Sequence, residues 1–303
     1  MGLGLIAFRQ VTIMLILMLV GILCAKTNMI DEHANNKLSS VLLYLVTPAV
    51  IFMSFQRPLE ADLVRGLGLA FLLTILTFAF TITFSNFIYK NRPDGRKQVE
   101  IFGSVYSNSG FIGLPLVYGV FGSDGVFYIS AWIVFSSSMN WLHGVMVMSG
   151  ENSFAFIRKA LLTPPILTTL TGLVFFFLQI QLPEILLAPV GMIRDLNTPL
   201  AMIIAGVTLV NANVKKVVSN INIYKYCFIR LIVIPFIVLM TFNQFNIDPL
   251  IRGVIVVAAG CPAAVVTILF AKRYDKDHLY ASELVVSSTV ISLITLPILL
   301  FFV

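Results

Sequence analysis

Chemistry in this chain could come from the stretch Ser104–Pro115, which reads Ser-Val-Tyr-Ser-Asn-Ser-Gly-Phe-Ile-Gly-Leu-Pro. The stretch lies in an apolar segment long enough to cross a bilayer, which takes about 20 residues. Gly110 and Gly113 relax the backbone, and Pro115 has no N–H to donate, so we expect a helix broken at Pro115. Backbone groups freed at membrane depth are tolerated only where protein or a water-filled cavity satisfies them.

A second interrupted segment has the same Gly-x-Pro core. It reads Ala-Gly-Cys-Pro-Ala-Ala over Ala259–Ala264, and Pro262 comes 147 residues after Pro115. Two interrupted membrane segments at matching places in two halves of a chain point to the substrate site of a transporter. We therefore expect the two broken helices to cross near the middle of the bilayer.

Such a crossing could hold an anion without any arginine. The N-terminus of a half-helix carries a positive partial charge and free N–H groups, which can bind a carboxylate. Asn108 could add an amide donor to the same substrate. The alternative is that these small and polar residues only pack helices together. The substrate-binding candidates are Asn108, Ser109, Gly113, Pro115, Asn140, Cys261 and Pro262.

Two titratable residues could couple transport to an ion. Glu283 is expected early in the last apolar segment, where a carboxylate could carry a proton, or could instead pair with a cation near the interface. His143 titrates near neutral pH but is more often a hydrogen-bonded structural group. Pro48 and Pro199, each preceded by Thr, are expected to form paired kinks that act as hinges or simply bend their helices.

The composition is that of an integral membrane protein. The 303 residues are 58% hydrophobic and 11% charged, whereas a soluble domain is about 45–50% apolar. No basic run is interleaved with aromatic residues, so nucleic-acid binding is not expected. Hydropathy predicts ten membrane segments, at about 8–28, 38–56, 66–89, 99–121, 125–148, 160–180, 186–210, 224–243, 249–271 and 279–302.

Lysine and arginine set the expected orientation. Fourteen of them follow the odd-numbered segments and five lie on the opposite side. Positive charge favours the cytoplasm, so both termini are predicted to be extracytoplasmic in a multi-pass protein of the cell membrane.

The order of landmarks repeats between residues 1–150 and 151–303. Thr47–Pro48 corresponds to Thr198–Pro199, and Gly113 and Pro115 correspond to Gly260 and Pro262. Each half has five predicted helices, and an odd number inserts the second half upside down. We predict an all-α fold of ten transmembrane helices, built as two inverted five-helix repeats with broken helices 4 and 9.

Motifs of common hydrolases and of ATP-binding loops are not found, so we expect neither an enzyme nor a cofactor. Transport would then be driven by a solute gradient, an ion gradient or the membrane potential. A membrane receptor that binds a carboxylate without moving it, and an intramembrane enzyme, are the rivals from other classes.

The sequence resembles the auxin efflux carrier family, which includes plant auxin exporters and bacterial permeases for malate and malonate. The matching residues are Asn108–Leu116, the two Thr-Pro pairs, Cys261–Pro262 and Phe270–Tyr274. The resemblance implies a scaffold domain of helices 1, 2, 6 and 7, and a transport domain of helices 3–5 and 8–10. It also implies that Asn108 and the two crossover prolines surround the substrate carboxylate. The chain looks like a short prokaryotic member, because it lacks the long loop of the plant exporters.

We therefore predict a secondary transporter of small organic anions, such as malate or an auxin-like weak acid, working by alternating access. The alternative is a sodium-coupled organic anion symporter similar to bile acid carriers. Coupling to protons and uniport both stay open, and so does a homodimer.

Overall fold

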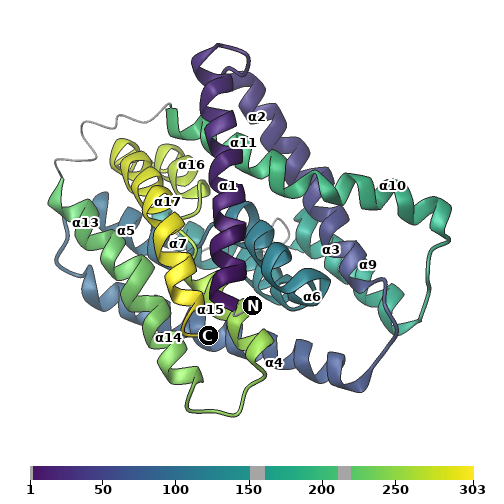
Figure 1. Ribbon diagram of the computed structural model, residues 1–303. Coiled ribbons are helices and arrows are strands. Elements are labelled where there is room, and N and C mark those ends of the chain that lie inside the picture. The colour runs from purple at the N-terminus through teal and green to yellow at the C-terminus, as the bar shows by residue number, and fades with distance from the viewer. Residues whose placement is uncertain (1–2, 151–160, 211–219) are drawn as a thin grey trace.

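The computed structural model describes residues 3–150, 161–210 and 220–303. Within these ranges the chain is helical, and Figure 1 shows its helices packed into one bundle with both ends of the chain on the same side. Four charged residues of the expected topology signal, Arg158, Lys159, Lys215 and Lys216, lie outside the described residues.

The described helices follow each other closely along the chain. Those of the first half are α1 (Leu3–Lys26), α2 (Glu32–Val41), α3 (Thr47–Phe55), α4 (Ala61–Ile88), α5 (Arg96–Val105), α6 (Leu114–Met139) and α7 (Val145–Ser149). Those of the second half are α9 (Pro164–Phe177), α10 (Glu184–Asp195), α11 (Asn197–Val210), α13 (Ile221–Phe228), α14 (Ile234–Phe242), α15 (Pro249–Gly260), α16 (Val266–Arg273) and α17 (His278–Leu300). Four π-helical turns join some of them: η1 (Leu42–Val46), η2 (Ser109–Gly113), η3 (Asn140–Gly144) and η5 (Ile229–Val233).

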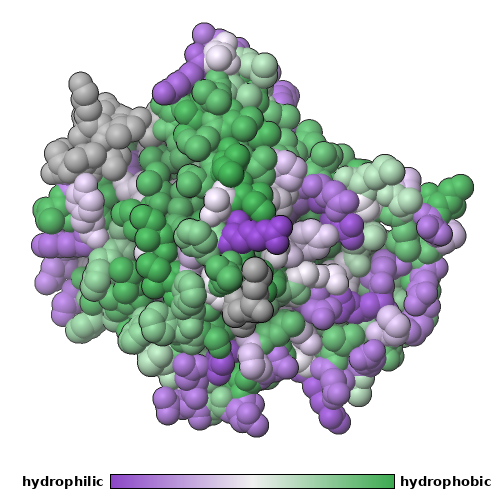
Figure 2. Space-filling view, viewed as in Figure 1, coloured by the Kyte–Doolittle hydropathy of each residue, from purple (hydrophilic) through white to green (hydrophobic). Residues whose placement is uncertain are grey.

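Seven helical stretches of the described residues are long and apolar enough to cross a membrane. Two shorter apolar helices, α9 and α15, accompany them. Helix α1 shows why a bilayer is needed, because Phe8, Ile16 and Leu23 on its outer face are 56–60% exposed and would meet water in a soluble protein. Figure 2 shows this apolar surface over α1, α14 and α17. The expectation of an all-α membrane protein is therefore confirmed for the described residues.

Helix α6 contains a chain reversal at Gly122. This glycine has φ 64° and ψ −152°, a conformation that L side chains rarely adopt. A Cβ added to Gly125 would lie 2.7 Å from Cγ1 of Val117, although eight residues of straight helix would separate them by about 12 Å. The continuous run Ser109–Ser149 is therefore sharply bent at Gly122, which lies between the fourth and fifth predicted segments.

Three prolines inside the spans each follow a widened turn instead of ending the helix. Three π-helical turns, η1, η2 and η5, each end two residues before a proline: Pro48, Pro115 and Pro235. Proline lacks an N–H and crowds the carbonyl four residues back, and a π-turn relieves that crowding while the helix continues. The second Thr-Pro pair follows a different break, because α10 and α11 are separated at Leu196, three residues before Pro199.

The helices form two groups that Figure 1 shows side by side, with α1 between them. Helices α2, α3, α9, α10 and α11 pack with one another, and α1 packs on α11, α6 and α17. Helices α4, α5, α13, α14, α15, α16 and α17 form the other group. Helix α6 contacts both groups, through α3 and α9 on one side and α4 and α15 on the other. Helices α1 and α11 approach very closely, because Gly21 faces the backbone of Ile203 and Gly206 faces the backbone of Met18.

Candidate functional site

Two unwound segments meet at the centre of the molecule. The first, residues 106–108, separates α5 from η2, and the second, residues 261–265, separates α15 from α16. Ser107 and Ala263 form an antiparallel β-bridge. The N–H of Asn108 donates to the carbonyl of Pro262 at 2.8 Å, and the N–H of Ala264 donates to that of Tyr106 at 3.0 Å. Each segment thus satisfies backbone groups that the other exposes. We call these two segments the crossover.

The first break does not lie at Pro115, where the sequence analysis expected it. The helix ends at Val105 because Tyr106 takes an extended conformation, with φ −100° and ψ 107°. Pro115 is the second residue of α6. The π-helical turn η2 precedes it and accommodates the proline, which has no N–H to donate, so the helix continues. Pro262 does lie inside the second break, as expected.

Four helix ends converge on the crossover. The C-termini of α5 and α15 lie at the crossover, and so do the N-termini of η2 and α16. The first N–H groups of a helix have no intrahelical acceptor, and no side chain caps η2. A Cβ added to Gly110 in this first turn would meet no atom within 4 Å. The N-terminus of η2 therefore has both free donors and open space beside it.

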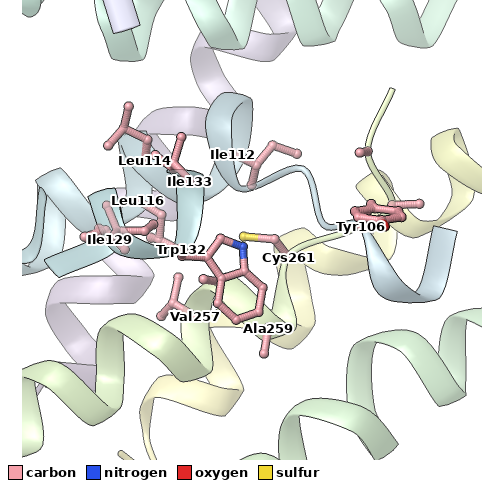
Figure 3. Close-up of a cluster of buried hydrophobic side chains, with 14 of the residues drawn as sticks. Tyr106, Ile112, Leu114, Leu116, Ile129, Trp132, Ile133, Val257, Ala259 and Cys261 are labelled. Atoms are coloured by element: carbon pink, nitrogen blue, oxygen red, sulfur yellow. The ribbon is translucent and has the colours of Figure 1, made fainter. Parts of the chain in front are cut away.

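The candidate residues of the crossover are buried. Asn108 is 7% exposed, and among the described residues its amide side chain has no recorded hydrogen bond. Gly113 packs against Cys261, because a Cβ there would lie 3.0 Å from the sulfur. Figure 3 shows Trp132 facing Cys261 beneath this contact. The indole N–H of Trp132 donates to Oγ of Ser107 at 3.2 Å, which anchors the first break.

The π-turn η3 lies against the first break. The hydroxyl of Tyr106 donates to the carbonyl of Met139 at 2.8 Å and lies 2.9 Å from Nδ1 of His143. His143 is thus hydrogen-bonded to a residue of the crossover. This arrangement agrees with the alternative that His143 is a structural group. Asn140 begins the same turn, and its Oδ1 is buried with no hydrogen-bond partner among the described residues.

Arg230 is the cation beside the crossover, although its place about one turn inside the predicted segment 224–243 favours, from sequence alone, a side chain that snorkels to the interface or pairs. It is 1% exposed, and its Nη1 donates to the carbonyl of Ala259 at the C-terminus of α15. None of the ion pairs among the described residues involves it, and its buried Nε has no hydrogen-bond partner there. One turn earlier, Tyr226 is also fully buried.

The most buried carboxylate is Glu100, also missed from the sequence. Its Oε1 accepts a hydrogen bond from the hydroxyl of Tyr280 at 2.6 Å. Its Oε2 lies 3.0 Å from Nε of Arg92, with side chains 1% and 30% exposed. Glu100 therefore ties the loop before α5 to the start of α17.

Glu283 lies half-buried in a surface pocket near the same end of the molecule, together with Arg96 and Asp277. It is the sixth residue of α17 and comes five residues before Ser288, whose Oγ accepts a hydrogen bond from the N–H of Ala263 in the crossover at 3.2 Å. In the adjoining loop, a hydrogen bond from the Gln98 side chain and the charge of Lys276 hold the pKa of Asp94 below its ordinary value.

The two Thr-Pro pairs lie in the other group of helices, at the starts of α3 and α11. The hydroxyl of Thr47 is buried without a recorded partner, and so are both polar atoms of the Asn197 side chain. Buried polar groups without partners are costly in a protein interior. The helix starts beside Pro48 and Pro199 therefore each hold buried polar atoms that lack a protein partner among the described residues.

Almost the whole chain matches one known protein family. The model of the family described as "Membrane transport protein" matches residues 6–153 and 148–300. The chain belongs to this family. The resemblance to auxin efflux carriers is thereby confirmed.

Curated relatives of the membrane transport protein family match almost the whole chain. An uncharacterized transporter of Methanothermobacter thermautotrophicus is 25% identical over 299 residues, covering 94% of each chain. An uncharacterized transporter of Methanocaldococcus jannaschii is 22% identical, covering 92% of this chain and 93% of its own. A protein of Rhizobium meliloti named "Putative malonate transporter" is 21% identical, covering 95% and 92%.

Sequence reasoning found the crossover of this transporter but missed its charges. Arg230 could be seen as a basic residue inside an apolar run, yet only the packing shows that it points at α15 instead of the interface. Glu100 follows a basic stretch, and nothing local reveals that Tyr280 and Arg92 bury it.

Proposed function

We propose that this protein is a secondary transporter of small carboxylates that works by alternating access around the crossover. The observation that carries the proposal is a buried arginine beside two unwound segments, with no acidic partner among the described residues. A cation buried at membrane depth is costly unless an opposite charge accompanies it. A carboxylate substrate would supply that charge.

The helix dipoles lead to the same substrate class. Each helix end carries roughly half an elementary charge, positive at N-termini and negative at C-termini. Two ends of each kind meet at the crossover, so their partial charges approximately cancel. The full charge of Arg230 is then left over, and it favours an anion over a neutral or cationic solute.

The uncapped first turn of η2 is the expected docking point for the carboxylate. The N–H groups of Ile112 and Gly113 donate to the carbonyl of Asn108, whereas those of the three residues before them have no acceptor among the described residues. Gly110 leaves room beside these free groups, and the side chain of Asn108 precedes them. Backbone N–H groups at a helix start bind carboxylates in many proteins. Ser109, Gly113, Pro115, Cys261 and Pro262 would then shape the cavity.

Ten spans in two inverted repeats would explain how the site can open to either side. Two facts support this architecture. The bridge between Ser107 and Ala263 is antiparallel, as expected for segments of opposite orientation. The mutually packed helices α2, α3, α9, α10 and α11 also fall in segments 2, 6 and 7, which the family resemblance assigns to a scaffold domain. Movement of one group against the other would expose the crossover alternately.

Malonate is the first substrate to test, because one relative carries that name. Purified protein is reconstituted in vesicles loaded with unlabelled malonate, and uptake of labelled malonate is followed at two pH values with and without sodium. We expect counterflow, because a carrier exchanges solute across the bilayer while a receptor or an enzyme does not. Malate and a neutral diamide complete the panel.

Asn108→Ala serves as the site test, and Asn86→Ala serves as its matched control. Asn86 lies on α4 and binds the carbonyl of Ile82 within its own helix. We expect loss of counterflow only in Asn108→Ala. Uptake that requires sodium would support the symporter instead, and equal transport of the diamide would contradict the anion assignment.

A further inference from the structure

A deep apolar groove opens between α4 and α14, away from the crossover. Its volume is about 460 Å³. Helix α4 contributes Leu69, Leu73 and Leu76, and α14 with the segment after it contributes Ile237, Phe242 and Phe245. Both helices belong to stretches long and apolar enough to cross a membrane. The groove therefore faces hydrocarbon, which is the medium that must fill it.

The lining excludes a polar occupant. Threonines 77 and 241 are its only polar residue types, and the hydroxyl of Thr77 already donates to the carbonyl of Leu73 at 2.7 Å. An occupant that needs hydrogen bonds would lose them on entry. A hydrocarbon chain loses nothing and gains contacts with the leucine and phenylalanine side chains.

The length of the groove matches one leaflet of a bilayer. From Leu69 to Phe80 the helix rises by roughly 16 Å, at 1.5 Å per residue. One leaflet contributes half of a hydrocarbon core of about 30 Å, which is about 15 Å. An acyl chain lying along α4 would therefore span the groove from end to end.

The positively charged Arg65 lies where the phosphate headgroup of that lipid would be. Arg65 is one turn before Leu69 on the same face of α4, a rise of about 6 Å. Its side chain is 82% exposed, and its only recorded ion pair is a long one of 3.7 Å to Asp62, itself 95% exposed. Exposed pairs of this kind hold a side chain weakly, and a guanidinium binds phosphate with two parallel hydrogen bonds.

We propose that the groove is a binding site for one phospholipid, with an acyl chain between α4 and α14 and the phosphate at Arg65. Both helices pack against α15, which ends at the crossover. The bound lipid thus fills the gap between two neighbours of the helix that Arg230 caps. This site is independent of the proposed carboxylate transport.

The test uses purified full-length protein and phosphatidylglycerol. Native mass spectrometry counts the lipids retained after delipidation and titration. Leu76→Trp places a bulky ring in the groove, and Arg65→Gln removes the phosphate-binding charge. The matched controls are Leu170→Trp on the exposed face of α9 and Arg9→Gln on α1. We expect the tightest lipid to be lost in Leu76→Trp and to bind at least fivefold more weakly in Arg65→Gln, with both controls like the wild type.

A second measurement needs no substitution. Phosphatidylglycerol with a photoreactive group on its acyl chain is irradiated with the native protein, and labelled peptides are mapped. Labels concentrated in residues 69–80 and 237–247 support the site. Labels elsewhere, unchanged retention in Leu76→Trp, or unchanged affinity in Arg65→Gln would overturn it. A change in oligomeric state with Leu76→Trp, without a change in lipid retention, would identify the groove as a contact between two copies of this chain.

Discussion

Arg230 keeps its charge in a place from which water is excluded. Its guanidinium donates to the carbonyl of Ala259 near the end of α15, and its Nε has no protein acceptor among the described residues. At this scale the substrate class rests on one side chain, because no other buried cation lies beside the crossover in the part of the chain that the structure describes.

Removing that charge is expected to weaken anion transport without unfolding the protein. In Arg230→Gln the shorter amide does not reach the carbonyl of Ala259, but the buried charge and its desolvation cost disappear as well, and these two effects on stability oppose each other. We expect the KM for the carboxylate to rise at least tenfold, which is about 1.4 kcal/mol, with an unchanged melting temperature. Arg230→Lys keeps the charge and should lose less. An unchanged KM in Arg230→Gln would remove Arg230 from substrate binding.

Glu100 is expected to be a structural carboxylate. In Glu100→Gln the bond to Tyr280 can persist, but Arg92 loses its buried partner. Breaking a fully buried pair costs about 3–5 kcal/mol, and the partial exposure of Arg92 should reduce this to roughly 1–3 kcal/mol. Thermal unfolding should show a midpoint several degrees lower. If the midpoint stays the same, the ion pair contributes nothing to stability.

Glu283 is the candidate for proton coupling. It has no ion pair among the described residues, so Glu283→Gln should leave the melting temperature unchanged. The expected effect is on function: the pH dependence of counterflow should flatten, because the glutamine cannot exchange a proton. A mutant with the wild-type pH profile would exclude Glu283 as the proton carrier.

At the scale of the element, the two glycines of η2 allow an effect on substrate binding to be distinguished from an effect on stability. Gly110 has open space at its Cβ position, whereas a Cβ at Gly113 would meet the sulfur of Cys261 at 3.0 Å and Ser109 at 3.3 Å. The two glycines thus differ in what surrounds them. One leaves room for a solute, and the other allows two helices to approach.

Alanine at these two positions should have opposite effects. Gly110→Ala should keep or raise stability, since alanine favours helix by about 0.5–1 kcal/mol over glycine, yet it should lower affinity by filling the substrate's space. Gly113→Ala should lower the melting temperature. Gly68→Ala is the matched control, because its Cβ on α4 also meets nothing within 4 Å. Equal transport by Gly110→Ala and Gly68→Ala would show that no substrate lies beside Gly110.

At the scale of the whole molecule, the proposed mechanism requires the two groups of helices to move past each other. Helix α1 touches α6 where the side chain of Gln10 packs on Gly119. Within one group, by contrast, Asn35 of α2 donates to the hydroxyl of Thr208 on α11 at 3.2 Å. The first contact should break during transport, and the second should persist.

Disulfide cross-links at these two contacts test the motion. A pair of cysteines at positions 10 and 119 should stop counterflow when oxidised and restore it when reduced. A pair at positions 35 and 208 should leave counterflow unchanged in both states. Full transport with the first pair cross-linked, verified by gel mobility, would rule out sliding at this contact.

The sequence by itself determined the class of fold and the place of the crossover. Long apolar runs can only be membrane helices, since every backbone group in lipid needs an internal partner. Glycine, proline and asparagine within such runs mark where the helix is interrupted, because these residue types act on their own backbone. That is why the broken segments near Asn108 and Pro262 could be predicted from local composition.

Only the tertiary structure decided where each break falls and which charges accompany it. The first helix ends at Val105 and not at Pro115, because pairing with residues 262–264 stabilises the extended backbone there while a π-turn accommodates the proline. Likewise Arg230 and Glu100 acquire their roles from partners 29 and 180 residues away. Contacts over such sequence distances depend on how the helices pack, which no local pattern of residues encodes.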